Sequence, residues 1–247
     1  MAGRSHWRPV STPVPPAVPV LVPVPAQLPV LLPVLAACGM AFEAALVAGP
    51  GVVAVCGPGP VRLADRLGAP LNAAGILSFG CAGALDPGLA PGTCVLATGV
   101  QTADGFLCAD AAWLGSLARH LPDAVHGELL GLDAPLLTAR DKASLWRSSG
   151  ACAVDMESHA AALVAQRHGL PFAACRVVLD PAWRSVPLVA LAGMLADGGM
   201  ALGPLLRALA AAPGELGPLC VLTCDAWRAR RALARVRTRL GERLALP

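Results

Sequence analysis

The sequence has no tyrosine, and aromatic residues make up only 4% of its 247 residues. Its formal net charge is +3, which is too small to attract a phosphate backbone strongly. Because proteins that hold single-stranded nucleic acid combine positive charge with aromatic side chains on which bases stack, we exclude nucleic acid as a partner. The apolar fraction of 55% allows a chain of this length to bury one full core. We therefore expect one catalytic domain.

The nine cysteines form no disulfide framework or zinc-ligand pattern. They are scattered, and most lie inside apolar runs, where cysteine behaves as a small hydrophobic residue. Cys220 and Cys224 are four residues apart, but no second Cys or His pair stands at zinc-ligand spacing. We expect no metal and a reducing, cytoplasmic compartment.

Motifs of several familiar enzyme classes are also missing. The chain has no G-x-S-x-G elbow and no complete P-loop. Ser158 and His159 are sequence neighbours, so they point apart on a helix and do not form a catalytic pair. No uninterrupted run of about twenty apolar residues marks a membrane span.

Proline and valine alternate over residues 1–28, which predicts a disordered, extended leader before a catalytic domain over 29–247. An alternative is a lipoprotein processing site at Leu35-Ala36-Ala37-Cys38. The prolines break the helical segment that such a signal needs, so the run Pro29–Cys38 is better explained as the first buried strand.

Short apolar runs then alternate with helical stretches, as in an α/β fold with a largely parallel sheet. A helix over Met156–His168, closed by Gly169 and Pro171, makes the last two strands part of a β-α-β unit. The predicted strands are Val30–Cys38, Val52–Cys56, Gly75–Phe79, Thr93–Ala97, Cys152–Asp155 and Phe172–Leu179.

The last third of the chain is of a different kind. Val186–Leu222 is rich in Leu, Ala, Gly and Pro, and Trp227–Arg243 carries seven arginines among apolar residues. The second segment predicts a basic amphipathic helix. Packing of its Leu and Val side chains on the core is the simpler interpretation, and contact with an anionic membrane or a lipid-like substrate is the other.

Ligands of α/β sheets bind beyond the carboxyl ends of the strands, and two carboxylates lie at such ends, Glu157 and Asp180. If their strands are adjacent and parallel, the ends lie roughly 5 Å apart and both side chains face one ligand. A carboxylate such as Glu157 can accept hydrogen bonds from the vicinal hydroxyls of a ribose, and the Met156 thioether offers an apolar wall.

Loss of a purine from ribose needs a general acid at the base, and Asp180 is the candidate. Its apolar neighbours would have to desolvate it, since an ordinary Asp has a pKa of about 3.9. Simpler alternatives stay open: Asp180 could cap a turn or pair with Arg176 or Arg184, and Glu157 could serve a helix N-terminus.

Two glycine-rich segments follow predicted strands. A loop of Gly80, Cys81, Ala82 and Gly83 could bring backbone N–H groups close to the base or to an anion. The segment Gly57–Pro60 is better explained as an ordinary tight turn, because its prolines lack the donors that a phosphate needs.

The segments Ala153–Ser158, Gly169–Phe172 and Arg176–Asp180, with Phe79–Leu85 before them, resemble the nucleoside phosphorylase superfamily, which includes the methylthioadenosine/S-adenosylhomocysteine nucleosidases. The continuation Asp180-Pro181-Ala182 and the Arg-ended C-terminal third resemble the hopanoid-associated phosphorylases.

The resemblance implies a three-layer α/β/α domain with a mixed, largely parallel sheet, usually in a homo-oligomer. It implies that Glu157, next to Met156, binds the ribose hydroxyls, that Asp180 protonates the purine and that Glu43 positions the attacking water. No cofactor is implied, only phosphate or water as co-substrate. The implied substrate is a purine nucleoside such as adenosylhopane, with methylthioadenosine or adenosylhomocysteine as the alternative substrate. The second alternative function is a nucleoside-binding protein without catalytic activity.

The sequence departs from the nucleosidase pattern at Leu179, where those enzymes usually carry serine, and it has no convincing phosphate-binding arginine. Phosphorolysis and hydrolysis therefore both stay open. The apolar stretch Val186–Leu206 would suit a substrate with a large hydrocarbon 5′ group, and we expect peripheral contact with the inner membrane through it and the basic tail.

Overall fold

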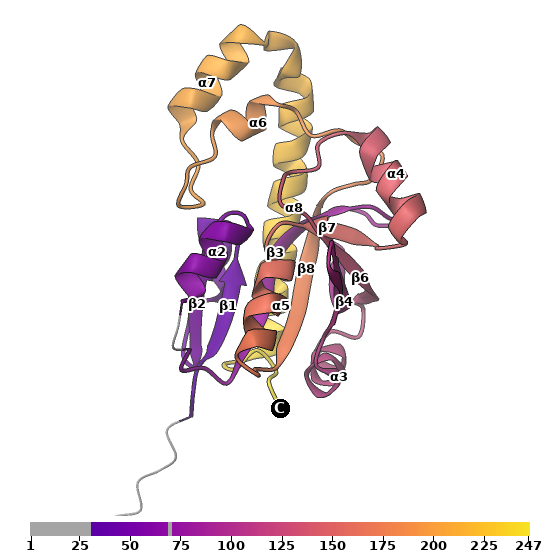
Figure 1. Ribbon diagram of the computed structural model, residues 1–247. Helices are drawn as coiled ribbons and strands as arrows, with labels where there is room; N and C mark the ends of the chain where they lie inside the picture. Colours follow the sequence, from indigo (N-terminus) through magenta and orange to yellow (C-terminus); the bar gives the residue numbers. More distant parts are fainter. Residues whose placement is uncertain (1–30, 69–70) are drawn as a thin grey trace, which may run out of the picture. The chain divides into compact units, whose positions relative to one another are not determined.

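The computed structural model describes residues 31–68 and 71–247. The leader predicted over residues 1–28 and the start of the first predicted strand lie outside this part of the chain. The described residues contain one mixed sheet (Figure 1). Its strands are β1 Val34–Cys38, β2 Val52–Cys56, β3 Gly75–Ala84, β4 Cys94–Thr102, β5 Gly105–Cys108, β6 Val125–Gly131, β7 Ala153–Asp155 and β8 Phe172–Asp180.

The sheet is largely parallel, as expected. β1 runs parallel to β2 and β3, β3 to β8, and β6 to β4 and β7. The antiparallel pairs are β3 with β7, β4 with β5 and β4 with β8. Because β8 joins β3 to β4 while β6 and β7 complete the circuit back to β3, this part of the sheet closes on itself like a barrel.

Helices cover both faces of the sheet, which gives the predicted three layers. Alternate residues of β8 enter two separate hydrophobic clusters, as expected for a strand buried on both sides. The first cluster includes residues of α2 and α5, and the second includes residues of α3 and α8. The helices are α1 Ala41–Val47, α2 Pro60–Leu67, α3 Ala111–His120, α4 Ala139–Ser149, α5 Ser158–Arg167, α6 Val189–Ala192, α7 Leu202–Ala211 and α8 Leu216–Leu240.

One expectation about the sheet is wrong, because β7 and β8 are neither adjacent nor parallel. The strand β3 lies between them, parallel to β8 and antiparallel to β7. Gly80–Gly83, predicted as a loop, continues β3 instead of ending it. The carboxylates of Glu157 and Asp180 still lie near each other, because Gly83 pairs both with Asp180 and with Val154, which lies three residues before Glu157.

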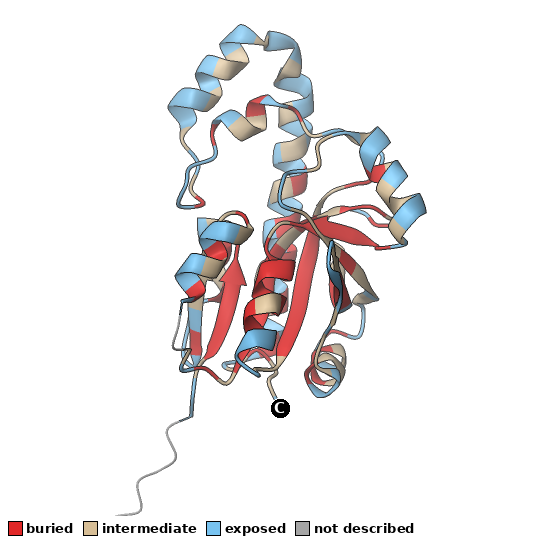
Figure 2. Cartoon of the chain, viewed as in Figure 1, coloured by how far each residue is buried: buried red, intermediate tan, exposed pale blue. Residues whose placement is uncertain are grey.

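The C-terminal third divides into two unlike parts. From Asp225 onward, α8 packs on the core through Ala229, Leu233 and Val236, as the simpler interpretation of the basic tail predicted. Residues 202–224 contain no buried residue, and Figure 2 shows α7 and the start of α8 without buried positions.

No single helix among the described residues is long and apolar enough to cross a membrane. The consecutive segments Leu202–Ala211 and Pro213–Leu240, bent by 114° at their junction, pass that test only when taken together.

Candidate active site

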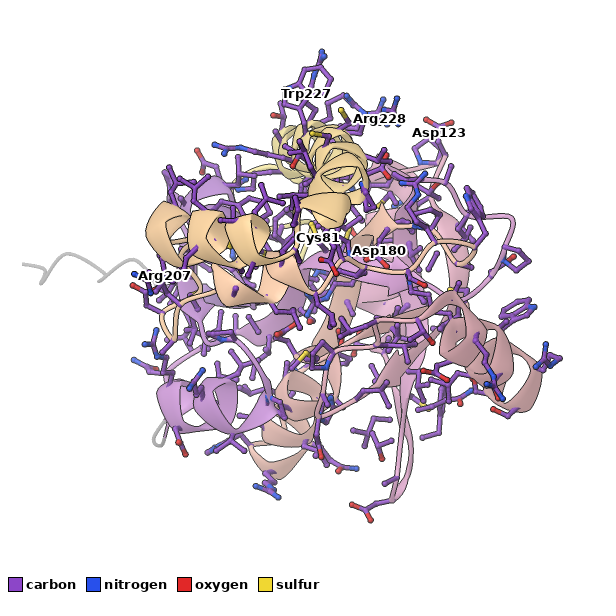
Figure 3. The ribbon with its side chains drawn as sticks, turned by 90° about the horizontal axis from the view of Figure 1, so that it is seen from above. Cys81, Asp123, Asp180, Arg207, Trp227 and Arg228 are labelled. Atoms are coloured by element: carbon purple, nitrogen blue, oxygen red, sulfur yellow. The ribbon has the colours of Figure 1, made fainter. Side chains whose placement is uncertain are left out.

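A cavity of about 220 Å³ lies at the carboxyl ends of β1, β3, β7 and β8. All the predicted site residues except Gly80 line it. In the view down onto this end of the sheet, Cys81 from β3 and Asp180 from β8 lie near the middle (Figure 3). The fold therefore brings together residues that are far apart in the sequence.

Glu43 sits in the first turn of α1, and its carboxylate is buried. Oε2 accepts hydrogen bonds from the backbone N–H groups of Gly39 at 3.0 Å and Met40 at 2.9 Å, and Oε1 accepts one from Cys81 at 2.7 Å. Burial raises the pKa of Glu43, although Arg176 and these donors oppose the shift. The side chain is therefore a desolvated carboxylate at the cavity wall.

Glu157 precedes α5 and faces the same cavity. Its Oε1 accepts a hydrogen bond from the Gly59 N–H at 3.1 Å, so the Gly57–Pro60 turn supports this carboxylate. Its Oε2 lies 3.6 Å from Nη1 of Arg176. Burial raises the pKa of Glu157 to about 7, against the lowering effect of Arg176. Near neutral pH this carboxyl therefore titrates.

Arg176 holds the acidic groups together from the middle of β8. Its side chain is buried, and Nε lies 2.8 Å from Oδ2 of Asp155. It also donates to the hydroxyl of Ser78 at 2.5 Å and of Ser158 at 3.2 Å. Burial alone would lower the pKa of Arg176, but the surrounding carboxylates raise it, so the guanidinium stays charged.

Asp180 is paired with a residue that the sequence analysis missed, Lys142 on α4. Lys142 is fully buried, and its Nζ contacts Asp180 and donates to the carbonyls of Pro181 at 3.1 Å and Arg184 at 2.9 Å. Burial raises the pKa of Asp180, while Lys142 lowers it. The suggested arginine partners are wrong, because Arg184 pairs with Asp225 and Arg176 with Asp155.

Lys142 and Arg176 both left signals in the sequence. Lys142 is the only lysine in the chain. Arg176 stands in the middle of an apolar strand, where an unpaired charge would be costly, so a buried acidic partner was implied. Neither signal identified which carboxylate each residue contacts.

The glycines of β3 serve the carboxylates directly. A side chain at Gly80 would lie 2.6 Å from Oε2 of Glu43, and one at Gly83 would lie 3.2 Å from Oδ2 of Asp180. Cys81 already donates its N–H to Glu43. The segment predicted as a loop that contacts the base or an anion is thus part of strand β3. Its two glycines have no side chain and so leave room for the carboxylates of Glu43 and Asp180.

The rest of the cavity wall is apolar. Met156 lies next to Glu157, and Leu179 lies where the predicted family pattern has serine. This apolar wall includes Leu191 of α6 and Met194 just after this helix, together with Leu136, Leu137 and Val186 from irregular segments. The cavity can thus hold a molecule that has both a polar part and an apolar part.

Comparison with known proteins agrees with this fold. A family model described as "Phosphorylase superfamily" matches residues 26–189, about two thirds of the chain. Among proteins with curated functions, no sequence matches.

Solved structures with the same fold include three nucleoside-cleaving enzymes. The chain is 16% identical to the 5′-methylthioadenosine/S-adenosylhomocysteine nucleosidase of Colwellia psychrerythraea 34H in complex with adenine, with a TM-score of 0.61 over 86% of this chain and 97% of that chain. It is 15% identical to the Helicobacter pylori nucleosidase of the same name with butyl-thio-DADMe-Immucillin-A, with a TM-score of 0.58 over 84% and 98%. It is 16% identical to futalosine hydrolase of Helicobacter pylori strain 26695, with a TM-score of 0.55 over 61% and 88%.

At these identities the solved structures establish the fold alone. The family match covers residues 26–189 of the chain that has this fold. The resemblance of the sequence to the nucleoside phosphorylase superfamily is confirmed. The expectation of an enzyme that cleaves N-glycosyl bonds is confirmed as well. The chain belongs to the phosphorylase superfamily.

Proposed function

We propose that this enzyme releases adenine from an adenosine derivative that carries a bulky apolar 5′ group, such as adenosylhopane. The observation that carries the proposal is that one cavity is lined both by Glu43, Glu157 and Asp180 and by a set of apolar residues that includes Leu191 of α6 and Met194. Structural relatives that act on nucleosides, one of them with adenine bound, support the choice of base.

In the proposed mechanism Glu157 accepts hydrogen bonds from the ribose 2′- and 3′-hydroxyls. Met156 packs against the sugar beside it. As the bond between C1′ and the purine nitrogen breaks, its electron pair moves to the base and positive charge builds on the ribose. A carboxylate held beside the sugar stabilises that charge more strongly in the transition state than in the ground state.

Asp180 delivers a proton to the departing purine in this mechanism. Its pKa is raised by burial, which favours the protonated form that a general acid needs. The ammonium of Lys142 acts in the opposite direction and lowers the pKa of Asp180. Lys142 is a positioning residue, because it holds Asp180 through contacts with the chain just after β8.

Glu43 orients the nucleophile, which attacks C1′ on the face opposite to the purine. Its burial and raised pKa suit a base that accepts a proton from water. Phosphate is the other nucleophile that the superfamily uses by name. The arginine of the site, Arg176, is already engaged with Asp155, Ser78 and Ser158, and this favours water. We also propose a homo-oligomer, as the family resemblance implied.

A second candidate is a methylthioadenosine/S-adenosylhomocysteine nucleosidase, since solved structures of that name share the fold. The same carboxylates of the cavity would serve it. A small 5′ group would leave the apolar wall at Val186, Leu191 and Met194 unfilled, and for this reason we place it second.

The length of the 5′ group tests the two candidates. We expect kcat/KM for adenine release to rise from adenosine through 5′-methylthioadenosine to 5′-alkyl adenosines of increasing chain length, because each methylene buried on the apolar wall adds up to about 0.8 kcal/mol. Running the series with and without phosphate identifies the nucleophile. A maximum at 5′-methylthioadenosine, followed by a fall for longer chains, would favour the second candidate.

The titration of Glu157 predicts the acid side of the pH profile. Its pKa of about 7 means that the carboxylate is lost as the pH falls below neutrality. A protonated carboxyl accepts the ribose hydroxyls less well, so kcat/KM should fall below about pH 7, approaching at least tenfold per pH unit, because Glu43 must be unprotonated as well. The free-enzyme profile measures this, and a profile flat down to pH 5 would contradict the assignment.

Replacing Lys142 by methionine should move the alkaline side of the kcat profile to higher pH. The ammonium lowers the pKa of Asp180, so Asp180 keeps its proton to higher pH once the ammonium is removed. Arg147→Met, an exposed change on the same helix, is the matched control and should leave the profile in place. If the alkaline limb does not move in a Lys142→Met enzyme that is still folded, Lys142 does not affect the titration of Asp180.

A further inference from the structure

Residues 202–224, comprising α7, the turn at Pro213–Glu215 and the first part of α8, form an apolar hairpin. Its only charged residues are Arg207 and Glu215, and Glu215 accepts a hydrogen bond from the Val189 N–H at 2.9 Å. None of its residues is buried. The hairpin lies beyond residue 189, where the match to the superfamily ends.

Such a surface is unusual for a protein in water. Leu202 is 69% exposed, Leu206 is 61% exposed, and Leu216 and Val221 are exposed as well. Apolar residues gathered in one exposed patch mark a surface that contacts something else, whereas isolated ones need no explanation. The hairpin is therefore expected to be covered by a partner.

The positive charge next to the hairpin indicates what kind of partner this is. Trp227 is 58% exposed, and the exposed positions of α8 that follow it include Arg228, Arg230, Arg231 and Arg235. The one acidic residue at this junction, Asp225, is buried and paired with arginines. Figure 3 shows Trp227 and Arg228 at the edge of the molecule, away from Asp180.

An apolar surface bordered by tryptophan and then by arginine matches the gradient from acyl chains to anionic headgroups. A second copy of the chain fits less well, because a two-fold contact brings the same surface of both copies together. The arginines of one copy would then lie near the arginines of the other, and like charges repel.

The hairpin is also tied to the mouth of the cavity. The chain leading into it passes through Leu191 and Met194, which line the cavity. It is then fastened to the β1–α1 connection, where the Ala41 N–H donates to the carbonyl of Gly198 at 2.9 Å. In Figure 1, α6, α7 and the start of α8 lie beyond the carboxyl ends of β1 and β2.

We propose that the apolar hairpin inserts into the surface of an anionic membrane, with the arginines of α8 at the headgroups and the cavity mouth toward the bilayer. The 114° bend between its helices suits a hairpin that lies in one leaflet. Delivery of a lipid-linked nucleoside from the bilayer to the site rests on the proposed function, whereas membrane binding does not.

Vesicle flotation with the purified full chain tests the proposal. At low salt the protein should float with vesicles of phosphatidylglycerol and phosphatidylcholine and much less with phosphatidylcholine alone. The double variant Leu206→Asp/Leu216→Asp should reduce the bound fraction at least about tenfold, and Arg231→Gln/Arg235→Gln should weaken binding most on anionic vesicles at low salt. Matched controls are Val61→Asp, an exposed apolar position on α2, and Arg167→Gln at the end of α5, both with wild-type binding.

Two results would overturn the proposal. One is wild-type protein that stays unbound on anionic vesicles at low salt. The other is an oligomer, seen by light scattering, that dissociates in Leu206→Asp/Leu216→Asp, because a second copy would then cover the hairpin. Adenine release from the water-soluble 5′-methylthioadenosine should be unchanged in that variant, so loss of membrane binding is distinguished from failure of the proposed function.

Discussion

Replacing Asp180 by asparagine should lower kcat for adenine release at least about a hundredfold. Asparagine has nearly the same shape, but it has no proton to give to the departing purine. Since Asp180 acts in the transition state, KM should change little. Steady-state kinetics with 5′-methylthioadenosine and a 5′-alkyl adenosine measure both constants.

The control is Asp110→Asn, which makes the same chemical change at the N-cap of α3, away from the cavity. Asparagine caps helices as well as aspartate does, so this variant should keep wild-type kcat. An Asp180→Asn enzyme with kcat within a few-fold of wild type would remove Asp180 from the role of general acid.

Replacing Arg176 by methionine should destabilise the fold by about 3–5 kcal/mol, the usual result of removing one partner from a buried ion pair. Asp155, Glu157 and Glu43 all depend on this guanidinium for compensation of their charge. Urea unfolding near pH 8 measures the loss. Arg167→Met, an exposed change at the end of α5, should stay within about 0.5 kcal/mol of wild type.

The Arg176→Met deficit should also shrink as the pH falls. The pKa values of Glu43 and Glu157 are already raised in the folded protein, that of Glu157 to about 7, and loss of the arginine raises them further. A folded state that holds protons more tightly than the unfolded chain gains stability as the pH decreases. The deficit should therefore be largest above pH 7 and smaller toward the ordinary glutamate pKa of about 4.3. A loss independent of pH would indicate lost packing rather than uncompensated charge.

The sequence predicted the individual strands and the helix around the site well, because their signals are local. β8 is a mostly apolar strand between Pro171 and Pro181, and α5 ends at Arg167, two residues before Gly169, whose φ of +63° suits glycine. The side chains that end these strands, Glu157 and Asp180, were therefore placed at the correct edge of the sheet.

The position of β3 could not be predicted from the same reasoning. A short helical crossover usually joins neighbouring parallel strands, but here β3 lies between β7 and β8. Gly80 and Gly83 suggested a turn, since glycine is common there, whereas they remain in the strand to accommodate Glu43 and Asp180. Sequence pattern alone does not distinguish these two uses of glycine.

Contacts between side chains that are far apart in the sequence could not be predicted either. Lys142 lies 38 residues from Asp180 in the sequence, on a helix whose place relative to β8 depends on the whole fold. The roles of Glu43, Glu157 and Asp180 remain proposals that rest on their shared cavity and on the family resemblance.

Free adenine formed by the wild-type enzyme tests the central claim most directly. Purified protein is incubated with an excess of 5′-methylthioadenosine or a 5′-alkyl adenosine, and adenine is quantified by chromatography over many turnovers. The account predicts adenine in amounts far above the enzyme concentration, together with one equivalent of the ribose product. Binding of these nucleosides, seen as a rise in melting temperature, without any adenine release would contradict it and would identify a nucleoside-binding protein that lacks the chemistry.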